Sequence, residues 1–252
     1  MSKPSIIRPA ARNSDHGINF LLYGDPGSGK TPFLATGERT LIIDIDGGAE
    51  SAVNSKADIW PAEDWPTLDE VYEYLRHDPN HGYHWVWLDG VSIGQEKLLE
   101  GIMVDLIDNQ NKKHRKPWAA DRGEYQENMV RIKQWVRHMS ALDFNFGITA
   151  HPFRWADPVT EVTRMWPWIQ GKNMPNTVCG YMNIIGYLKV GNDQKHRLYT
   201  RLTEDFYARD RFGALGAGLI NPSIPIIERK VKEATRPNLK VVRSTTSKAR
   251  RA

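Results

Sequence analysis

The stretch GDPGSGKT at residues 24–31 constrains the fold of this chain more than any other feature. It satisfies the pattern G-x-x-x-x-G-K-[S/T] in full and follows an apolar run, INFLLYG (18–24), which is the strand context that a phosphate-binding loop needs. In such a loop, glycines let backbone N–H groups surround an anion, the lysine reaches the β- and γ-phosphates, and the threonine hydroxyl binds Mg²⁺. A chance match in a glycine-rich turn is the alternative. We therefore expect ATP and Mg²⁺ to bind at Gly24, Asp25, Pro26, Gly27, Ser28, Gly29, Lys30 and Thr31.

Two residues in and beside this loop are unusual. Asp25 brings a carboxylate into an anion site, but it occupies a variable position, where the side chain can point outward while the amide faces phosphate. Pro32 directly follows the loop, and in the first turn of a helix its missing N–H removes no intrahelical hydrogen bond. Gly37 and the apolar run that begins at Thr40 leave room only for a short helix.

Apolar runs alternate with amphipathic stretches along the chain. Strands are expected at residues 18–24, 40–46, 83–90 and 144–151, and helices at 91–108, at 124–142 and from a Thr67–Glu70 capping box to Arg76. MNIIGYLKV and HRLYTRL, joined by GNDQ, form a later hairpin. This order predicts an α/β fold, with a mostly parallel sheet flanked by helices and a late antiparallel hairpin. The active edge then lies at the carboxyl ends of the strands.

Length and composition fit one main domain. A chain of 252 residues with 40% hydrophobic content can bury one substantial core. We expect a polar N-terminal segment at 1–15, the core at 16–230 and a basic C-terminal tail at 231–252. Because no apolar run approaches the length of a membrane span and no secretory signal opens the chain, we expect a cytoplasmic protein with no membrane partner. The one cysteine, Cys179, is expected in the core.

Polar residues at three strand ends are candidates for phosphate chemistry. Asp89 closes HWVWLD and is the expected carboxylate for the water shell of Mg²⁺; a helix N-cap is its alternative. Asp44 and Asp46 alternate with isoleucines and should share one side of a strand. Asp46 is the candidate for orienting or deprotonating the attacking water, with turn capping as the alternative. His151, after GITA, could sense the γ-phosphate or be structural.

Two segments interleave cations with aromatic residues, as a surface for single-stranded nucleic acid requires. The candidates in residues 108–125 are Lys112, Lys113, Arg115, Lys116 and Trp118. Those in residues 151–173 are Arg154, Trp155 and Arg164, with Trp166, Trp168 and Lys172 nearby. The alternative is that the tryptophans pack into the core or into a subunit interface.

Taken in order, the loop, IDIDGG, the WLDG strand, GITAHP, the IIGYL strand and ARDRFGAL resemble the RecA-like P-loop ATPases over residues 17–215. The likeness is to the compact phage and prophage AAA-type nucleotide-binding proteins, which include core-only single-strand annealing recombinases. The resemblance implies that Asp46 stands where recombinases carry a catalytic glutamate. It also implies that Arg209 and Arg211 contact nucleotide within the subunit or across a subunit boundary, surface ion pairs with Asp205 or Asp210 being the alternative.

These observations predict an ATP-hydrolysing DNA recombination or annealing protein that binds single-stranded DNA (ssDNA). The expected catalytic residues are Lys30, Asp46, Asp89, His151 and Arg211. The expected partners are ssDNA, further copies of the chain in a ring or filament, and a single-strand-binding protein. A nucleotide-gated replication accessory or loader protein with little turnover is the alternative. A small-molecule kinase is disfavoured because no arginine-rich lid segment is visible.

Overall fold

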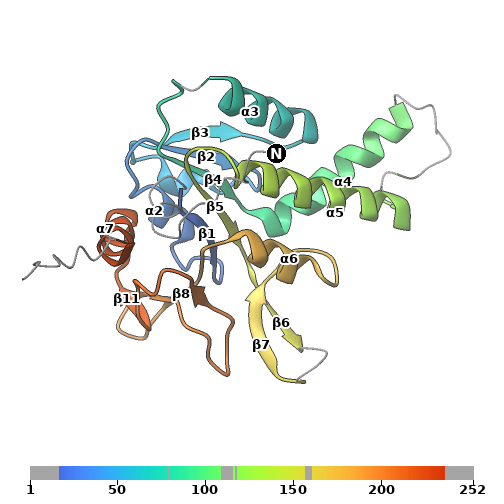
Figure 1. Ribbon diagram of the computed structural model, residues 1–252. Coiled ribbons are helices and arrows are strands. Elements are labelled where there is room, and N and C mark those ends of the chain that lie inside the picture. Colours follow the sequence, from blue (N-terminus) through green and yellow to red (C-terminus); the bar gives the residue numbers. More distant parts are fainter. Residues whose placement is uncertain (1–16, 79, 109–115, 117, 157–160, 236–252) are drawn as a thin grey trace, which may run out of the picture.

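The computed structural model describes residues 17–78, 80–108, 116, 118–156 and 161–235 (Figure 1). Within these residues, nine strands form one sheet in the order β11-β9-β8-β1-β5-β4-β2-β3, with β10 paired to β8. The expected N-terminal segment at 1–15 and most of the expected basic tail lie outside the described residues, as do Lys112, Lys113 and Arg115.

The centre of the sheet is parallel, as predicted. Its strands are β1 (Asn19–Tyr23), β2 (Thr40–Asp44), β3 (Asp58–Pro61), β4 (Trp85–Asp89), β5 (Asn145–Ala150) and β8 (Ile184–Val190). The register pairs Tyr23 with both Ala150 and Tyr187, and Asp44 with Asp89. The carboxyl ends of these strands therefore meet at one edge of the sheet, where the phosphate loop begins.

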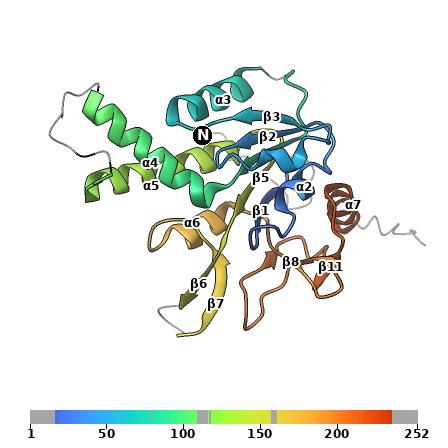
Figure 2. The same cartoon turned by 180° about the vertical axis from the view of Figure 1, so that it is seen from behind.

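The antiparallel part lies beside β8. β9 (His196–Tyr199) pairs with β8 as the predicted late hairpin, and β10 (Arg209–Asp210) and β11 (Gly218–Ile220) extend this side. β6 (Pro152–Ala156) and β7 (Thr163–Pro167) form a separate hairpin that projects from the sheet edge (Figures 1 and 2). The sequence patterns did not predict this second hairpin.

Helices cover both faces of the sheet because successive residues of each strand point to opposite sides. Leu21 and Tyr23 face a core that includes α3 (Trp65–His77), α4 (Val91–Asp108), α5 (Arg122–Met139) and α6 (Met174–Tyr181). Phe20 and Leu22 face a second core that includes α2 (Lys30–Leu34), the 3-10 helix η1 (Ala49–Ala52) and α7 (Ile224–Thr235). α3 and α7 lie on opposite sides of the sheet in both views (Figures 1 and 2). No helix in the described part of the chain is long and apolar enough to cross a membrane.

The helix predicted at 124–142 is observed at Arg122–Met139, and two further predicted boundaries are wrong for a clear structural reason. The helix predicted to open at Thr67 begins at Trp65, because the Asp64 carboxylate accepts the Thr67 N–H at 2.9 Å and is the N-cap. The strand predicted to reach Asp46 ends at Asp44. The Asp44 carboxylate accepts three backbone N–H groups of the following turn, which closes the strand early.

Candidate phosphate site and nucleic-acid interface

The phosphate loop leaves β1 and wraps around the start of α2. Gly27 (φ 76°) and Gly29 (φ 87°) adopt left-handed conformations that glycine takes without steric cost. A Cβ at Gly24 would lie 2.2 Å from the Leu188 carbonyl oxygen, so any side chain there would collide with β8. The Lys30 ammonium donates to the Gly24 carbonyl at 2.8 Å and to the Asp25 carbonyl at 3.2 Å. The loop is therefore held in a closed turn by its own lysine, while Asp25 and Pro26 are exposed.

Asp89 is held between two threonines at the edge of the loop. The Thr31 hydroxyl donates to one carboxylate oxygen at 2.6 Å, and the Thr149 hydroxyl donates to the other. Thr149 in turn accepts the Gly90 N–H at 2.8 Å. Burial raises the pKa of Asp89, although both hydroxyl contacts act in the opposite direction. One oxygen of this acid is thus fixed beside Thr31 and the other beside Thr149, and its role in the metal shell stays a prediction.

Sequence reasoning missed Thr149. It is fully buried on β5, and its hydroxyl would be costly there without a partner. A lone hydroxyl near the end of the apolar strand FNFGITA was the available signal. Its position in the register, between β1 and β4, explains why it can reach Asp89 on the neighbouring strand.

The two acids of IDIDGG have separate positions. The Asp44 carboxylate accepts the N–H groups of Gly47 (2.9 Å), Gly48 (3.1 Å) and Ala49 (3.2 Å), so it caps the turn. Asp46 accepts one of these N–H groups, that of Gly48, at 3.0 Å. Its carboxyl group lies against Gly90, where an added Cβ would be 2.2 Å away. Asp46 is therefore beside Asp89 and remains partly exposed toward the loop.

His151 follows β5 and lies at the same edge. The backbone N–H of His151 donates to the Ser92 hydroxyl at 2.8 Å, and its backbone carbonyl accepts the Trp168 N–H at 2.7 Å. Burial and the nearby Lys30 ammonium lower the pKa of His151, while Asp46 and Asp25 act to raise it. The imidazole is therefore neutral near pH 7 and within electrostatic reach of the loop.

The Lys30 ammonium interacts electrostatically with Asp25, Asp46, Asp89 and His151. Burial lowers its pKa, and Asp89, Asp46 and Asp25 oppose that shift. Four of the five predicted catalytic residues are thus brought together at one sheet edge: Lys30, Asp46, Asp89 and His151.

Arg209 and Arg211 lie elsewhere. Arg209 pairs with Ile185 on β8 and donates to the carbonyls of Cys179 (2.5 Å) and Met182 (3.1 Å). Because β10 runs antiparallel to β8, Arg211 lies near the amino end of β8 and donates to the Gly180 carbonyl at 2.8 Å. Both cations therefore bind the carboxyl end of α6, where helix carbonyls attract positive charge. These contacts do not place either cation beside the phosphate loop, and a contact with nucleotide, within the subunit or across a subunit boundary, stays a prediction.

A cavity with a partly apolar wall borders Gly29 of the loop and the start of α2. It has a volume of about 260 Å³ and is lined by Gly29, Pro32, Phe33, Thr36, Leu188, His196, Asn221 and Pro222. The His196 Nδ1 atom lies 2.9 Å from the Ser28 carbonyl, and the ring covers Gly29. Sequence reasoning missed His196 because this contact joins residues 168 positions apart in the chain.

The predicted nucleic-acid residues are only partly described. Trp118 is 80% exposed, and Lys116 is also exposed. Arg154 is exposed on β6, and Arg164 is half-buried on β7. Trp155 packs edge-on against Trp166 at 5.0 Å, and Trp166 is buried and stacked 3.9 Å from Tyr207. Inward packing is thus correct for Trp166, and Trp155 has one edge covered.

The donors at the loop fit a hard cation. The described residues contain no group of three or more His, Cys, Asp or Glu that could hold a metal ion. Mg²⁺ needs no such cage, since it binds through one or two protein oxygens together with phosphate and water. Thr31 and Asp89 provide oxygens of this kind, and the buried Ser28 hydroxyl has no hydrogen-bond partner. The loop therefore offers the oxygens that a magnesium nucleotide requires.

Comparison with known proteins agrees with this geometry. A family model described as an AAA domain matches residues 16–212, which include the loop, Asp46, Asp89, His151 and the β6–β7 hairpin. A search of curated proteins finds no match to the chain. AAA domains are nucleotide-binding P-loop domains, in general with ATPase activity. The chain therefore belongs to the AAA domain family, and its fold is that of an α/β P-loop NTPase.

Proposed function

We propose that this protein binds ATP in the phosphate loop, hydrolyses it, and binds ssDNA as a recombination or annealing protein. The observation that carries the ATPase proposal is the Asp89 carboxylate held between the hydroxyls of Thr31 and Thr149. The same sheet edge bears His151, and the β6–β7 hairpin, which carries Arg154 and Arg164, begins at the next residue. This adjacency supports a link between nucleotide and DNA.

Each residue at the loop has a proposed task in hydrolysis. The backbone N–H groups of the loop and the Lys30 ammonium bind the phosphates, and the cavity beside Gly29 and His196 accepts the nucleobase. Bound Mg²⁺ would neutralise phosphate charge, with Thr31 and Asp89 holding it and its water shell. Asp46 orients the attacking water and accepts its proton as the new bond to the γ-phosphorus forms. The bond to the β–γ bridging oxygen breaks, which releases ADP and phosphate.

Charge and aromatic character support ssDNA as the second ligand. Arg154 is exposed and Arg164 is half-buried on the projecting hairpin, and Lys116 and Trp118 are exposed at another surface. Cations attract the phosphates of a single strand, and an exposed ring can stack on its bases. We further propose that copies of the chain assemble on DNA, with Arg211 as a candidate contact to a neighbouring subunit.

A specific observation favours a second candidate function, a nucleotide-gated loader or accessory protein with little turnover. The Asp46 carboxylate accepts the Gly48 N–H at 3.0 Å, and Asp is one methylene shorter than Glu. In that case ATP binding would control DNA binding without rapid hydrolysis.

The test is ssDNA affinity across a salt series, measured with ATP, with a non-hydrolysable analogue and without nucleotide. The proposal expects salt-dependent binding that changes with nucleotide, and ATP hydrolysis that ssDNA stimulates. Equal binding with ATP and with the analogue, at negligible turnover, would support the gated alternative. Absence of salt-dependent ssDNA binding together with unstimulated hydrolysis would exclude the recombination function.

A further inference from the structure

Four cations line a groove between the β6–β7 hairpin and the β8–β9 hairpin. The groove has a volume of about 820 Å³, and its cations are Arg154, Arg164, Lys189 and Arg201. Asp205 is the one carboxylate among its described lining residues. The ion pairs within the described part of the chain involve none of the four cations. Their charge is therefore available to a polyanion.

Aromatic rings form the floor of this groove. Tyr187, Tyr199 and Phe206 are mutual neighbours, with ring centroids 5.0–6.5 Å apart. Tyr187 and Phe206 are buried, whereas Tyr199 is half-exposed. A half-exposed ring among cations is the arrangement on which a single-stranded base can stack.

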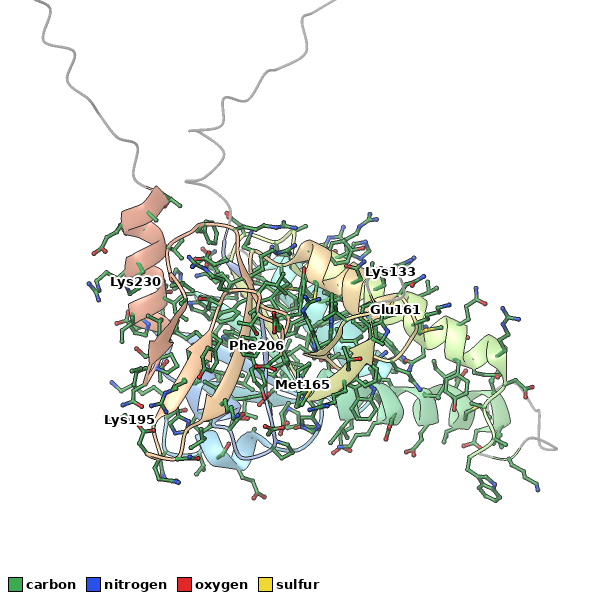
Figure 3. All side chains as sticks on the ribbon, turned by 90° about the horizontal axis from the view of Figure 1, so that it is seen from below. Lys133, Glu161, Met165, Lys195, Phe206 and Lys230 are labelled. Atoms are coloured by element: carbon green, nitrogen blue, oxygen red, sulfur yellow. The ribbon has the colours of Figure 1, made fainter. Side chains whose placement is uncertain are left out.

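Hydrogen bonds fix the two walls relative to each other. Arg164 Nε donates to the Thr203 carbonyl at 2.8 Å, and the Met165 N–H donates to the Asp205 carbonyl at 2.7 Å. Met165 and Phe206 form an isolated bridge and lie near each other at the centre of Figure 3. The hairpin is thus tied to the segment after β9, and the groove is a built feature of the fold.

The floor of the groove touches the phosphate loop. Tyr187 pairs in the sheet with Tyr23, which is the last residue of β1 before the loop, and their rings are 5.0 Å apart. The backbone of Leu188, the next residue, packs against Gly24. Burial and the Asp25 carboxylate of the loop raise the pKa of the Tyr187 phenol. Tyr187 therefore lines the groove and packs against the strand that leads into the loop.

We propose that ssDNA lies in this groove, with Lys189 and Arg201 as phosphate contacts, and that Tyr187 and Asp25 couple its occupancy to that of the phosphate loop. The inference rests on the proposed ssDNA binding and adds the site and the link. It also gives the unusual Asp25 a role, since Asp25 is the one acid in the loop sequence GDPGSGKT.

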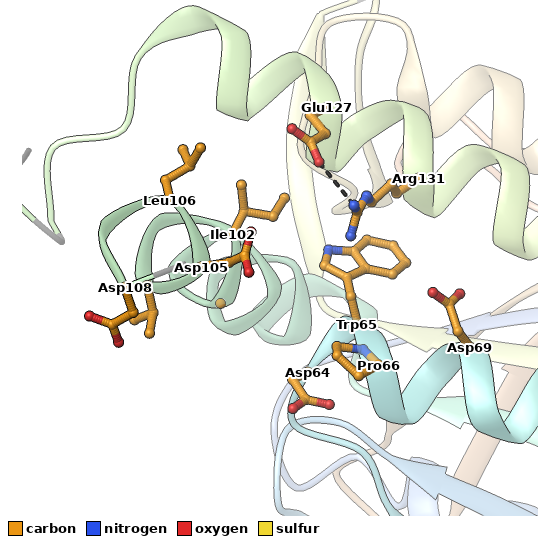
Figure 4. A pocket seen from close by; sticks show the side chains of 12 residues that line it. Asp64, Trp65, Pro66, Asp69, Ile102, Asp105, Leu106, Asp108, Glu127 and Arg131 are labelled. Atoms are coloured by element: carbon orange, nitrogen blue, oxygen red, sulfur yellow. Dashed lines mark ion pairs between the residues drawn. The ribbon is translucent and has the colours of Figure 1, made fainter. Parts of the chain in front are cut away.

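A second groove of similar size provides an internal contrast. Its volume is about 690 Å³, and it lies between α3, α4 and α5 (Figure 4). Five of its lining residues are acidic: Asp64, Asp69, Asp105, Asp108 and Glu127. Arg131 is paired with Glu127 at 3.1 Å and lies over the Trp65 ring. Such a surface repels phosphates, so size alone does not select the DNA site.

The first test measures binding of a fluorescein-labelled oligothymidylate to the full chain without nucleotide, over a salt series. Lys189→Gln combined with Arg201→Gln should lower the slope of log affinity against log salt by about 1.4, because each neutralised phosphate of a single strand adds about 0.7 to that slope. Lys230→Gln combined with Lys232→Gln on α7 is the matched control, since it removes the same charge away from the groove. An equal reduction of the slope in both double variants would overturn the groove assignment.

The second test measures the coupling between ssDNA in the groove and nucleotide in the phosphate loop. We expect Tyr187→Phe to bring the ratio of ssDNA affinities with and without a non-hydrolysable ATP analogue close to 1, because the ring stays while the hydroxyl that Asp25 influences is removed. Tyr199→Phe, which removes a hydroxyl from the same aromatic floor, should retain the wild-type ratio. A wild-type ratio in Tyr187→Phe would overturn the coupling.

The outcomes separate this inference from the proposed function. Wild-type protein that binds no oligothymidylate at any salt concentration contradicts both. Wild-type protein that binds with a salt-dependent slope, while the groove variant keeps that slope, leaves the proposed function standing and overturns the groove. A reduced slope in the groove variant alone supports both.

Discussion

The phosphate site and the basic groove are neighbours built in opposite ways. At the site, Asp89 is buried and bonded to two threonine hydroxyls, so its position is set by short contacts inside the core. In the groove, Lys189 and Arg201 are exposed and outside the ion pairs of the described residues. The first arrangement fixes geometry, whereas the second provides charge. Changes at the site should therefore act sharply and changes in the groove gradually, with a dependence on salt.

The largest effect is expected for Asp89→Asn. Removing the charge should lower ATP hydrolysis by about 10³-fold, while ssDNA binding without nucleotide stays unchanged. Because burial penalises this carboxylate, the variant should unfold at the same temperature or higher. Steady-state hydrolysis, oligothymidylate binding and thermal unfolding check the three parts. A hydrolysis rate within about twofold of wild type would contradict the claim that changes at the phosphate site act more sharply than changes in the groove.

Asp46→Asn should lower hydrolysis by about 10²-fold with ATP affinity retained, since a positioned acid contributes on this scale. Single-turnover hydrolysis and equilibrium nucleotide binding separate the two quantities. Asp44→Asn is a useful comparison, because the Asp44 carboxylate caps the turn by accepting three backbone N–H groups. This variant should lower the free energy of unfolding of the protein instead of its turnover. Unchanged turnover in Asp46→Asn, with ssDNA binding intact, would favour the nucleotide-gated alternative.

Thr149→Val tests the contact that sequence reasoning missed. It keeps the shape of the side chain, removes one partner of Asp89 and leaves the Gly90 N–H without its acceptor. We expect hydrolysis to fall by about tenfold and the free energy of unfolding to fall by about 1–3 kcal/mol. Thr149→Ser, which retains the hydroxyl, should recover most of both. If Val and Ser behave alike, the hydroxyl does not position Asp89.

The smallest effect is expected from the protonation of His151. Its pKa is lowered in the folded protein, so the unfolded chain binds the proton more readily below its ordinary value of 6.5. Stability from this residue is therefore complete above about pH 6.5 and declines as the pH falls toward the folded pKa. His151→Gln should reduce the loss of thermal stability between about pH 7 and pH 5.5. An identical pH profile in wild type and variant would contradict this sign.

Features that depend on residues close together in the sequence were easier to predict than features that depend on contacts between distant segments. The loop, the short α2 and the position of Asp89 follow from local patterns, because glycines, a proline and a strand-end acid have local conformational meanings. Thr149 and His196 act through contacts between distant segments, and Tyr187 lies near the start of the loop only because β1 pairs with β8. The positions of Arg209 and Arg211 could not be predicted from local patterns, because the direction of β10 is set by its pairing with β8.

The central claim, that ATP in this loop is linked to ssDNA on the adjacent basic surface, is tested most directly by hydrolysis measured during an ssDNA titration. The full chain should hydrolyse ATP faster as ssDNA is added, and Lys30→Ala should remove both the basal and the stimulated rates. A rate that ssDNA does not change, or one that survives in Lys30→Ala, would contradict it.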